Sequence, residues 1–172
     1  MSPTPTGRLL RTADGYDVVH TRTFRAPIDD VWASVTEPER TARWFGPWKG
    51  EAGPGRTVQV QMSYEDNAPW CDLRIDECEP PRRLAVSIID EAGHWRMELL
   101  LDESAGATEL RFAQHLESTT GIGEIGPGWE YYLDALVAAT KGEPRPNFDD
   151  YYPAHREHYE RQAAELEAGQ AS

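Results

Sequence analysis

One segment near the end of the chain, residues 121–142 (GIGEIGPGWEYYLDALVAATKG), most limits what this protein can fold into. After a Gly-Pro-Gly break it runs without a helix breaker from Trp129 to Lys141 and stops at Gly142. Its apolar residues recur on one helical face: Trp129, Leu133, Leu136 and Val137. Because an amphipathic helix this short is marginal in water, other parts of the chain must cover that face.

The residues before this helix supply the cover, because they form a series of short strand patterns separated by polar turns. Asp14-Gly15, for example, is a hairpin signal. The predicted strands are residues 7–12, 16–25, 57–64, 69–78, 83–90, 94–103 and 108–116. Short strands at regular spacing predict one curved antiparallel sheet wrapped around the long helix. Glu130 and Asp134 lie away from the helix face that this sheet would cover.

Two short helices are predicted between the second and third strands. Pro27 opens the first, and Asp29 and Asp30 follow in its first turn, where acids complement the helix dipole. Thr36 stands three residues before Glu39, which is the spacing of a capping box, so Thr36 is predicted to cap the second helix. An aromatic cluster follows at a turn: Trp44-Phe45-Gly46-Pro47-Trp48.

The length of 172 residues fits one domain with a short extension. Residues 1–6 are predicted to be a flexible leader and residues 7–142 to form the domain. Residues 143–172 contain a proline-rich connector and then a helix from near Pro153 to Glu167. The apolar stripe of that helix is thin, so we expect it to pack as a satellite through Tyr159, Ala163 and Leu166.

The charge of the chain argues against two classes of partner. Thirty acids against seventeen bases give a formal net charge of −13, which repels nucleic acid backbones and anionic lipid head groups. No run approaches the about 20 apolar residues of a membrane span, and the N-terminal residues lack the apolar core of a signal peptide. We therefore expect a cytoplasmic protein with no nucleic acid and no membrane partner.

The two cysteines are expected to be free thiols. Cys71 and Cys78 are seven residues apart in one predicted strand, which separates them by about 23 Å and puts them on opposite faces. A disulfide needs α-carbons within about 7 Å, so this strand excludes a bridge between them.

Several motifs along residues 7–142 occur in an order that resembles a known family. They are Arg22-Thr23-Phe24-Arg25-Ala26-Pro27-Ile28-Asp29-Asp30-Val31-Trp32, Thr36-Glu37-Pro38-Glu39, Arg43-Trp44-Phe45, Asp76-Glu77-Cys78-Glu79-Pro80-Pro81-Arg82-Arg83-Leu84, Gly106-Ala107-Thr108-Glu109-Leu110 and Gly128-Trp129. With the order of elements, they resemble the START-like (SRPBCC, Bet v 1-like) proteins, and within them the family related to the activator of Hsp90 ATPase (AHSA1-like).

The resemblance implies an α+β helix-grip fold with an apolar pocket between the sheet and the long helix. It implies no particular reaction, because this superfamily uses the pocket for lipid transport, hormone sensing, cyclisation or ring hydroxylation. The Hsp90-activating members also carry a chaperone-binding domain for which a chain of this length has no room, so a chaperone partner is not expected.

Metal and cofactor chemistry find little support in the sequence. His155 and His158 lie one helical turn apart with Glu157 and Asp149-Asp150 nearby, but the helix that carries them has the pattern of a solvated face. There is no His-Cys pattern for an iron–sulfur cluster, no nucleophile elbow and no phosphate-binding loop after a strand. The sequence therefore predicts no metal and no cofactor.

Acid–base catalysis would need a charged side chain that faces the pocket. Strand alternation places Glu98 and His115 on the solvent face, opposite the apolar residues of their strands. Asp72 and Arg74 alternate with the inward face on which Cys71 is expected as a buried, inert thiol. An inward-facing acid or base would have a shifted pKa and could act on a bound ligand, which keeps an enzyme open as an alternative.

The excess of aromatic residues is the most informative feature for function, because small-molecule sites are mostly apolar. The predicted ligand-binding residues are Val60, Met62, Leu73, Trp95, Met97, Leu99, Phe112, Trp129 and Tyr132. We expect a non-catalytic protein that binds a small apolar molecule. The alternatives are a cyclase- or aromatase-like enzyme and a chaperone-regulating interaction module. The ligand, the oligomeric state (a homodimer included) and the role of residues 143–172 stay open.

Overall fold

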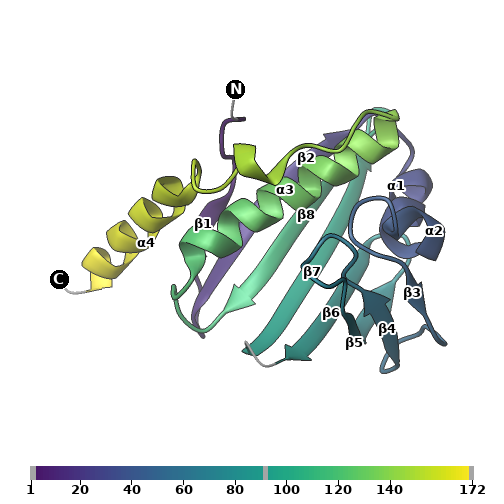
Figure 1. The fold of residues 1–172 in the computed structure, drawn as a ribbon, viewed down its shortest axis with the longest axis horizontal. Helices are drawn as coiled ribbons and strands as arrows, with labels where there is room; N and C mark the ends of the chain where they lie inside the picture. The colour runs from purple at the N-terminus through teal and green to yellow at the C-terminus, as the bar shows by residue number, and fades with distance from the viewer. Residues whose placement is uncertain (1–2, 91–92, 171–172) are drawn as a thin grey trace.

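The computed structural model describes residues 3–90 and 93–170 of the chain (Figure 1). The strands are β1 (Arg8–Arg11), β2 (Tyr16–Phe24), β3 (Trp48–Lys49), β4 (Thr57–Gln61), β5 (Trp70–Glu79), β6 (Arg83–Asp90), β7 (Gly93–Ser104) and β8 (Ala107–Leu116). The helices are α1 (Ile28–Thr36), α2 (Pro38–Thr41), α3 (Ile122–Lys141), the 3-10 turn η1 (Phe148–Asp150) and α4 (Arg156–Gln170). None of the described helices is long and apolar enough to cross a membrane.

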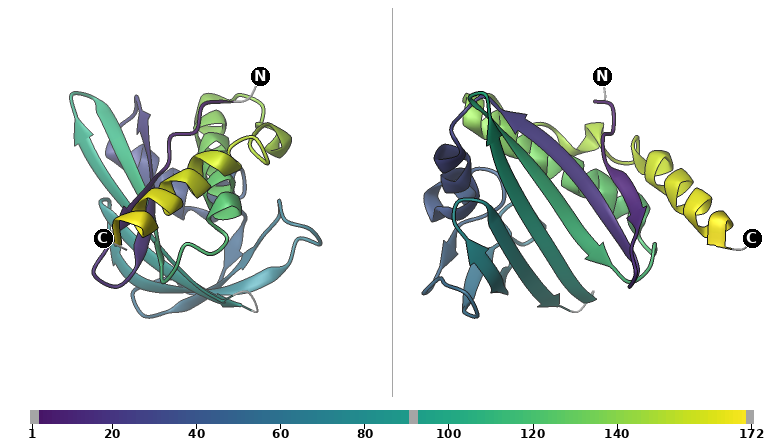
Figure 2. Two further views of the ribbon diagram at one scale, coloured as in Figure 1. Left: turned by 90° about the vertical axis from the view of Figure 1, so that its left-hand side faces the viewer. Right: turned by 180° about the vertical axis from the view of Figure 1, so that it is seen from behind.

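The strands form one antiparallel sheet in the order β1-β2-β8-β7-β6-β5-β4-β3. In Figures 1 and 2 the sheet curves around α3, which lies along its concave side. Phe112 of β8 pairs with His20 of β2 on one side and with Leu99 of β7 on the other, so these three residues lie side by side across adjacent strands. This arrangement confirms the α+β helix-grip fold predicted from the sequence.

Alternation along the strands decides which face meets the helix. In β7, Met97, Leu99 and Leu101 are buried, whereas the residues between them lie on the convex face. Leu133 and Leu136 of α3 are each 1% exposed and belong to the same core cluster. The predicted apolar face of the helix is therefore covered by the sheet.

The long helix begins earlier than predicted, at Ile122 instead of Trp129. Gly121 precedes it with a φ of 79°, and Pro127 lies inside it. Gly126, the first glycine of the Gly-Pro-Gly segment that suggested a break, is a contact point instead: a Cβ there would lie 2.4 Å from the ring of Tyr159 in α4. Any side chain at Gly126 is excluded because α4 crosses the first turns of α3.

Two further local predictions are wrong. Thr36 does not cap α2, because its hydroxyl donates to a carbonyl of α1 at 2.7 Å, and Glu37 at the N-cap makes no side-chain capping bond. Strand β4 ends at Gln61, and the chain then turns, so that Tyr64 is 40% exposed instead of continuing the strand.

The C-terminal helix packs as the expected satellite, although it begins at Arg156 instead of Pro153. Its Tyr159, Ala163 and Leu166 contact a small cluster that includes Leu9 of β1. This cluster covers the side of α3 that faces away from the main core. Figure 1 shows α4 beside β1 and the start of α3, at the far end of the molecule from α1 and α2.

The leader predicted as residues 1–6 is held in its described part, whereas Met1 and Ser2 lie outside the described residues. The carbonyl of Pro3 contacts Nε2 of His155 at 2.5 Å. The amide of Thr6 donates to the carboxylate of Glu130 at 2.5 Å. The segment therefore links α3 to the α4 region.

Candidate functional site

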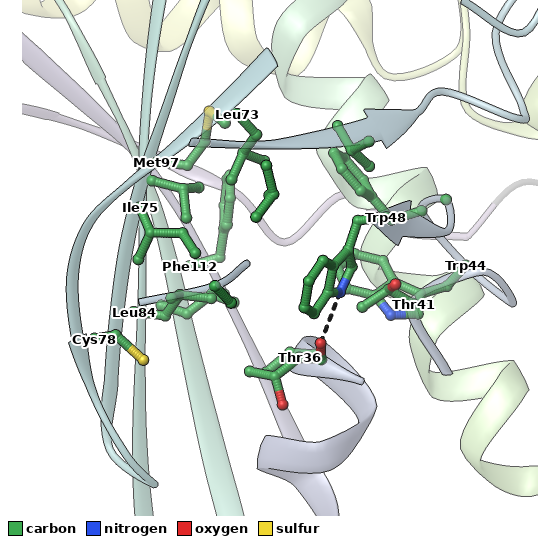
Figure 3. Close-up of a pocket in the computed structure, with 18 of the residues that line it drawn as sticks. Thr36, Thr41, Trp44, Trp48, Leu73, Ile75, Cys78, Leu84, Met97 and Phe112 are labelled. Atoms are coloured by element: carbon green, nitrogen blue, oxygen red, sulfur yellow. Dashed lines mark hydrogen bonds between the residues drawn. The ribbon is translucent and has the colours of Figure 1, made fainter. Parts of the chain in front are cut away.

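An apolar cavity of about 180 Å³ lies between the concave face of the sheet, α1 and α3 (Figure 3). Its aliphatic wall comes from four strands and consists of Val58, Val60, Leu73, Ile75, Leu84, Val86, Met97 and Leu99. Its aromatic wall consists of Trp44, Phe45, Trp48, Phe112 and Trp129. Ala52, which is exposed in the loop between β3 and β4, also lines the cavity, so the cavity reaches the surface beside this loop.

Each indole of the aromatic wall has its polar edge satisfied by the protein. Trp129 donates to the buried side chain of Gln114 at 2.6 Å, and its ring lies 4.3 Å from that of Phe112 between centroids. Trp48 donates to the carbonyl of Thr36 at 2.8 Å, as Figure 3 shows. Trp44 donates in the same way to a carbonyl of α1 at 2.9 Å. These hydrogen bonds hold the rings in place and leave the cavity with carbon surfaces.

Few polar side chains reach the cavity besides these indoles. The hydroxyls of Thr36 and Thr41 already donate to backbone carbonyls at 2.7 and 3.3 Å. Burial raises the pKa of the Cys78 thiol, which keeps it neutral. Among the described residues the lining contains no acid and no basic side chain. The cavity can therefore bury an apolar group but offers no group that transfers a proton readily.

Six of the predicted ligand-binding residues line this cavity: Val60, Leu73, Met97, Leu99, Phe112 and Trp129. The other three lie elsewhere. Met62 follows the end of β4, and the Trp95 indole donates to a carboxylate oxygen of Asp90 at 3.0 Å. The hydroxyl of Tyr132 donates to Glu65 at 2.5 Å, and its ring packs against those of Phe45 and Trp129 without itself lining the cavity.

Several lining residues were missing from the prediction. Val58, Ile75 and Val86 share strand faces with predicted residues or with a neighbouring strand, so strand alternation was a usable signal for them. The two threonines come from α1 and α2, Trp44 from the turn after them and Trp48 from the first position of the two-residue strand β3, where no strand alternation can be read. The only sequence signal for that part of the wall was the aromatic cluster itself.

The charged candidates lie on the other side of the sheet, as strand alternation predicted. Glu98 accepts from Arg83 at 2.6 Å, and His115 Nδ1 lies 2.7 Å from a carboxylate oxygen of Asp17. Arg74 pairs with an acid of its own strand. Asp72 is exposed, and Cys71 and Cys78 are free thiols, as expected. Cys71 is only half-buried, and the two cysteines do not lie on opposite faces, because a shift in register between Ile75 and Glu77 brings Cys78 to the cavity.

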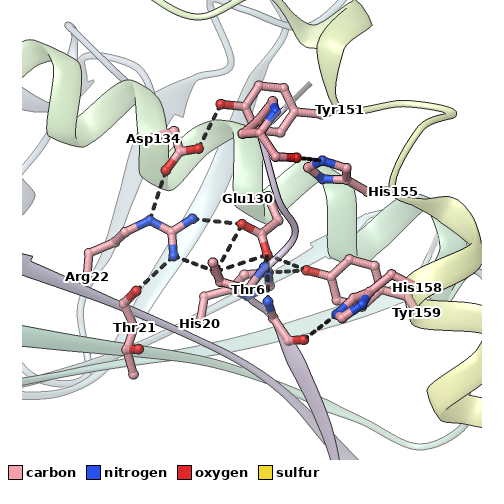
Figure 4. A network of polar contacts seen from close by, with 12 residues as sticks. Thr6, His20, Thr21, Arg22, Glu130, Asp134, Tyr151, His155, His158 and Tyr159 are labelled. Atoms are coloured by element: carbon pink, nitrogen blue, oxygen red, sulfur yellow. Dashed lines mark hydrogen bonds and ion pairs between the residues drawn. The ribbon is translucent and has the colours of Figure 1, made fainter. Parts of the chain in front are cut away.

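A second, polar arrangement lies on the opposite side of α3 (Figure 4). Glu130 is 1% exposed, although its place on the helix suggested a position away from the covered face. Its carboxylate accepts from the amides of Thr6 and Gly7 at 2.5 and 2.6 Å, and from the Tyr159 hydroxyl at 2.7 Å. Arg22 of β2 donates to it at 2.9 Å. This network joins the N-terminal segment, the sheet, α3 and α4.

His20 extends the network. Its Nε2 lies 2.8 Å from the hydroxyl oxygen of Tyr159. Because that hydroxyl donates its own proton to Glu130, its oxygen accepts here, and Nε2 of His20 is the protonated nitrogen that donates to it. Burial lowers the pKa of His20 to about 4, although the Glu130 carboxylate acts in the opposite direction. Burial alone would raise the pKa of Glu130, but His20, Tyr159 and Arg22 stabilise the carboxylate and lower it to about 2.

The histidines considered for a metal make other contacts. His155 and His158 each place Nε2 within hydrogen-bond distance of a backbone carbonyl, at 2.5 and 2.9 Å. Within residues 3–90 and 93–170, no group of three or more His, Cys, Asp or Glu side chains is arranged to hold a metal ion.

The free energy of unfolding is expected to fall as the pH drops from about 6.5 to about 4, by roughly 3 kcal/mol from His20. The unfolded histidine takes up a proton in this range and the folded one does not, so protonation favours unfolding. Glu130 extends the loss below its ordinary pKa of 4.5, because the unfolded carboxyl is protonated first. Urea titrations from pH 8 to 4 measure this slope. His20→Gln should flatten it and the exposed His94→Gln should not; equal slopes in both variants would contradict the assignment.

Known proteins with similar sequences and structures agree with this fold. The family model described as activator of Hsp90 ATPase homolog 1-like protein matches residues 25–141. The crystal structure of CalU16 from Micromonospora echinospora is 27% identical, with a TM-score of 0.77 over 94% of this chain and 99% of that one. The solution structure of the protein encoded by BPP1335 from Bordetella parapertussis is 21% identical, with a TM-score of 0.72 over 94% of this chain and 95% of that one, which shows the fold alone.

DynU16, a protein of the dynemicin biosynthetic locus, is 23% identical, with a TM-score of 0.65 over 83% of this chain and 51% of that one, which again shows only the fold. No curated protein matches the sequence. The family model spans α1 to the end of α3, which includes the cavity and the helix that the sheet encloses. The chain therefore belongs to the AHSA1-like family of the SRPBCC superfamily.

Proposed function

We propose that this protein binds a small apolar molecule, or the apolar end of a larger one, in the cavity between the sheet and α3. The observation that carries the proposal is the cavity itself, about 180 Å³ of space lined by aliphatic and aromatic side chains whose polar edges are satisfied elsewhere. Burying apolar surface is the only large favourable interaction that such a lining offers.

The size of the cavity limits the occupant. A dry apolar cavity of about 150 Å³ holds a benzene-sized molecule, so this cavity suits one substituted ring or a short branched acyl group. Removing about 300 Å² of ligand and protein surface from water would contribute roughly 7 kcal/mol before the costs of association. We therefore expect dissociation constants weaker than about 1 μM.

The composition of the lining favours a binder over an acid–base enzyme. A general acid or base must come within hydrogen-bond reach of the ligand. Glu98 and His115 lie on the convex face and pair there with Arg83 and Asp17. Neither side chain lines the cavity, so we expect Glu98→Gln and His115→Ala to leave ligand affinity unchanged within about threefold.

Filling the cavity is expected to abolish binding. Val86 lines it from β6, and a phenylalanine at this position would occupy the space of a ligand ring. Titration of wild-type protein with ethylbenzene, followed by ligand-observed NMR, should saturate. Val86→Phe should weaken the affinity by about tenfold or more.

Ala85→Phe is the matched control, because it adds the same ring one residue away on the opposite face of β6. It should change the affinity by less than about twofold. Urea titrations of both variants verify that they are folded. Unchanged ethylbenzene binding by folded Val86→Phe would place the ligand elsewhere and reject the proposal.

A further inference from the structure

A second groove, of about 530 Å³, lies on the other side of Trp44 from the apolar cavity. It is bounded by the end of β2, by α1 and α2, and by the last turn of α3. Figure 1 shows α1 and α2 beside the C-terminal end of α3. Its charged lining consists of four bases and one acid: Arg25, Arg40, Arg43, Lys141 and Asp30. The groove is therefore basic in a chain whose net charge is −13.

Most of these positive charges are not neutralised by the protein. Arg40 pairs with Glu37 at 3.1 Å. Arg25, Arg43 and Lys141 are exposed and form no ion pair with any described residue. With thirty acids in the chain, carboxylate partners are abundant, yet this groove holds three basic side chains without one. Like charges gathered in one concavity repel each other, and a bound anion would relieve that repulsion.

Two neutral hydroxyls of the groove are already engaged with backbone carbonyls, so the cations are its main donors. The hydroxyl of Ser34 donates to the carbonyl of Asp30 at 3.1 Å, and the hydroxyl of Thr140 donates to the carbonyl of Val137 at 2.7 Å. A guanidinium presents a planar fork of N–H groups that matches the oxygens of carboxylates and phosphates. The groove thus combines free arginine forks, a lysine and enough volume for a small polyanion.

We infer that this groove is a second ligand site, which binds a small molecule bearing carboxylate or phosphate groups. It is separate from the apolar cavity, because the indole of Trp44 borders both and is held in place by its hydrogen bond to the carbonyl of Ser34 at 2.9 Å. The shared oxyanion chemistry defines the site, and the choice between phosphate and carboxylate depends on how the ligand oxygens are spaced between Arg25, Arg43 and Lys141.

The test is calorimetric titration of the full chain with pyrophosphate and, separately, with citrate. Saturable binding of one molecule per chain is expected for at least one probe, and the tighter probe identifies the preferred group. Arg43→Gln should weaken the affinity about tenfold, because it removes one charge-assisted contact. Arg11→Gln is the matched control, since Arg11 is an exposed arginine on β1, away from the groove. It should change the affinity by less than about twofold.

Two outcomes would show that the groove is not an anion site. One is the absence of saturable binding by both probes. The other is an equal loss in Arg43→Gln and Arg11→Gln, which would mean that removing any one positive charge weakens binding and that no contact in the groove is responsible. Val86→Phe, which fills the apolar cavity, should leave pyrophosphate and citrate binding intact; loss of both there would show that the two sites are not separate.

Discussion

Replacing Glu130 by alanine is expected to lower the free energy of unfolding by about 3–5 kcal/mol. The carboxylate is 1% exposed and accepts hydrogen bonds from two amides of the N-terminal segment, from the hydroxyl of Tyr159 and from Arg22. Its removal would leave a guanidinium and several buried donors without their acceptor, and an unsatisfied buried group loses its hydration without compensation. Urea titration at pH 7 measures the loss.

Glu124→Ala is the matched control, because Glu124 is an exposed acid in the first turn of the same helix. Its loss should stay below about 1 kcal/mol, the value of a helix-dipole contact. Glu130→Gln keeps an acceptor oxygen but not the charge, and should fall between the two. Hydrogen exchange of α4 amides should rise in Glu130→Ala, since Tyr159 anchors that helix to α3. A loss below about 1 kcal/mol in Glu130→Ala would contradict the network.

The parts of the fold that depend on local periodicity could be predicted from the sequence. Alternation in β7 placed Met97 and Leu99 on the concave face and Glu98 on the convex one, and the structure agrees. The spacing of Leu133 and Leu136 likewise identified the helix face that the sheet covers. In each case the side-chain period and the direction of burial are properties of the segment itself.

Features that depend on distant contacts could not be predicted in this way. Glu130 is buried by Thr6, which lies 124 positions earlier in the chain, and by Tyr159 of α4. The same helix, α4, packs on the first turns of α3: Gly126 makes room for the Tyr159 ring and Gly123 for the side chains of Arg156 and Glu160. A helix with two covered faces has no single apolar stripe, so its periodicity reports only the face against the sheet.

The cavity was predictable on its strand side and not on its helix-and-turn side. The strands supply residues at alternate positions, which identified the face that bears Val60, Leu73 and Leu99. Trp44 reaches the cavity from a turn and Trp48 from the short strand β3, and hydrogen bonds to α1 carbonyls set the orientation of both indoles. Those contacts arise only once α1 and the turn are packed together.

Leu133→Ala tests the fold and the apolar cavity together, because Leu133 is 1% exposed and also lines the cavity. The substitution should lower the free energy of unfolding by about 2–5 kcal/mol, as for other buried leucines. The space it vacates would merge with the existing cavity, so the preferred probe should shift from ethylbenzene toward the larger naphthalene. At about 100 times its dissociation constant, a probe that fills the enlarged cavity should restore about 2.7 kcal/mol.

Leu100→Ala is the control for this experiment, since Leu100 lies between the inward-facing residues of β7 and does not line the cavity. It should cost less stability and leave the preference for ethylbenzene over naphthalene unchanged. A loss below about 0.5 kcal/mol in Leu133→Ala would mean that this face of α3 is not buried against the sheet. The expected loss of about 2–5 kcal/mol with no change in probe preference would instead support the fold but show that the ligand does not bind in this cavity. Deleting a lining side chain must alter which probes the cavity accepts.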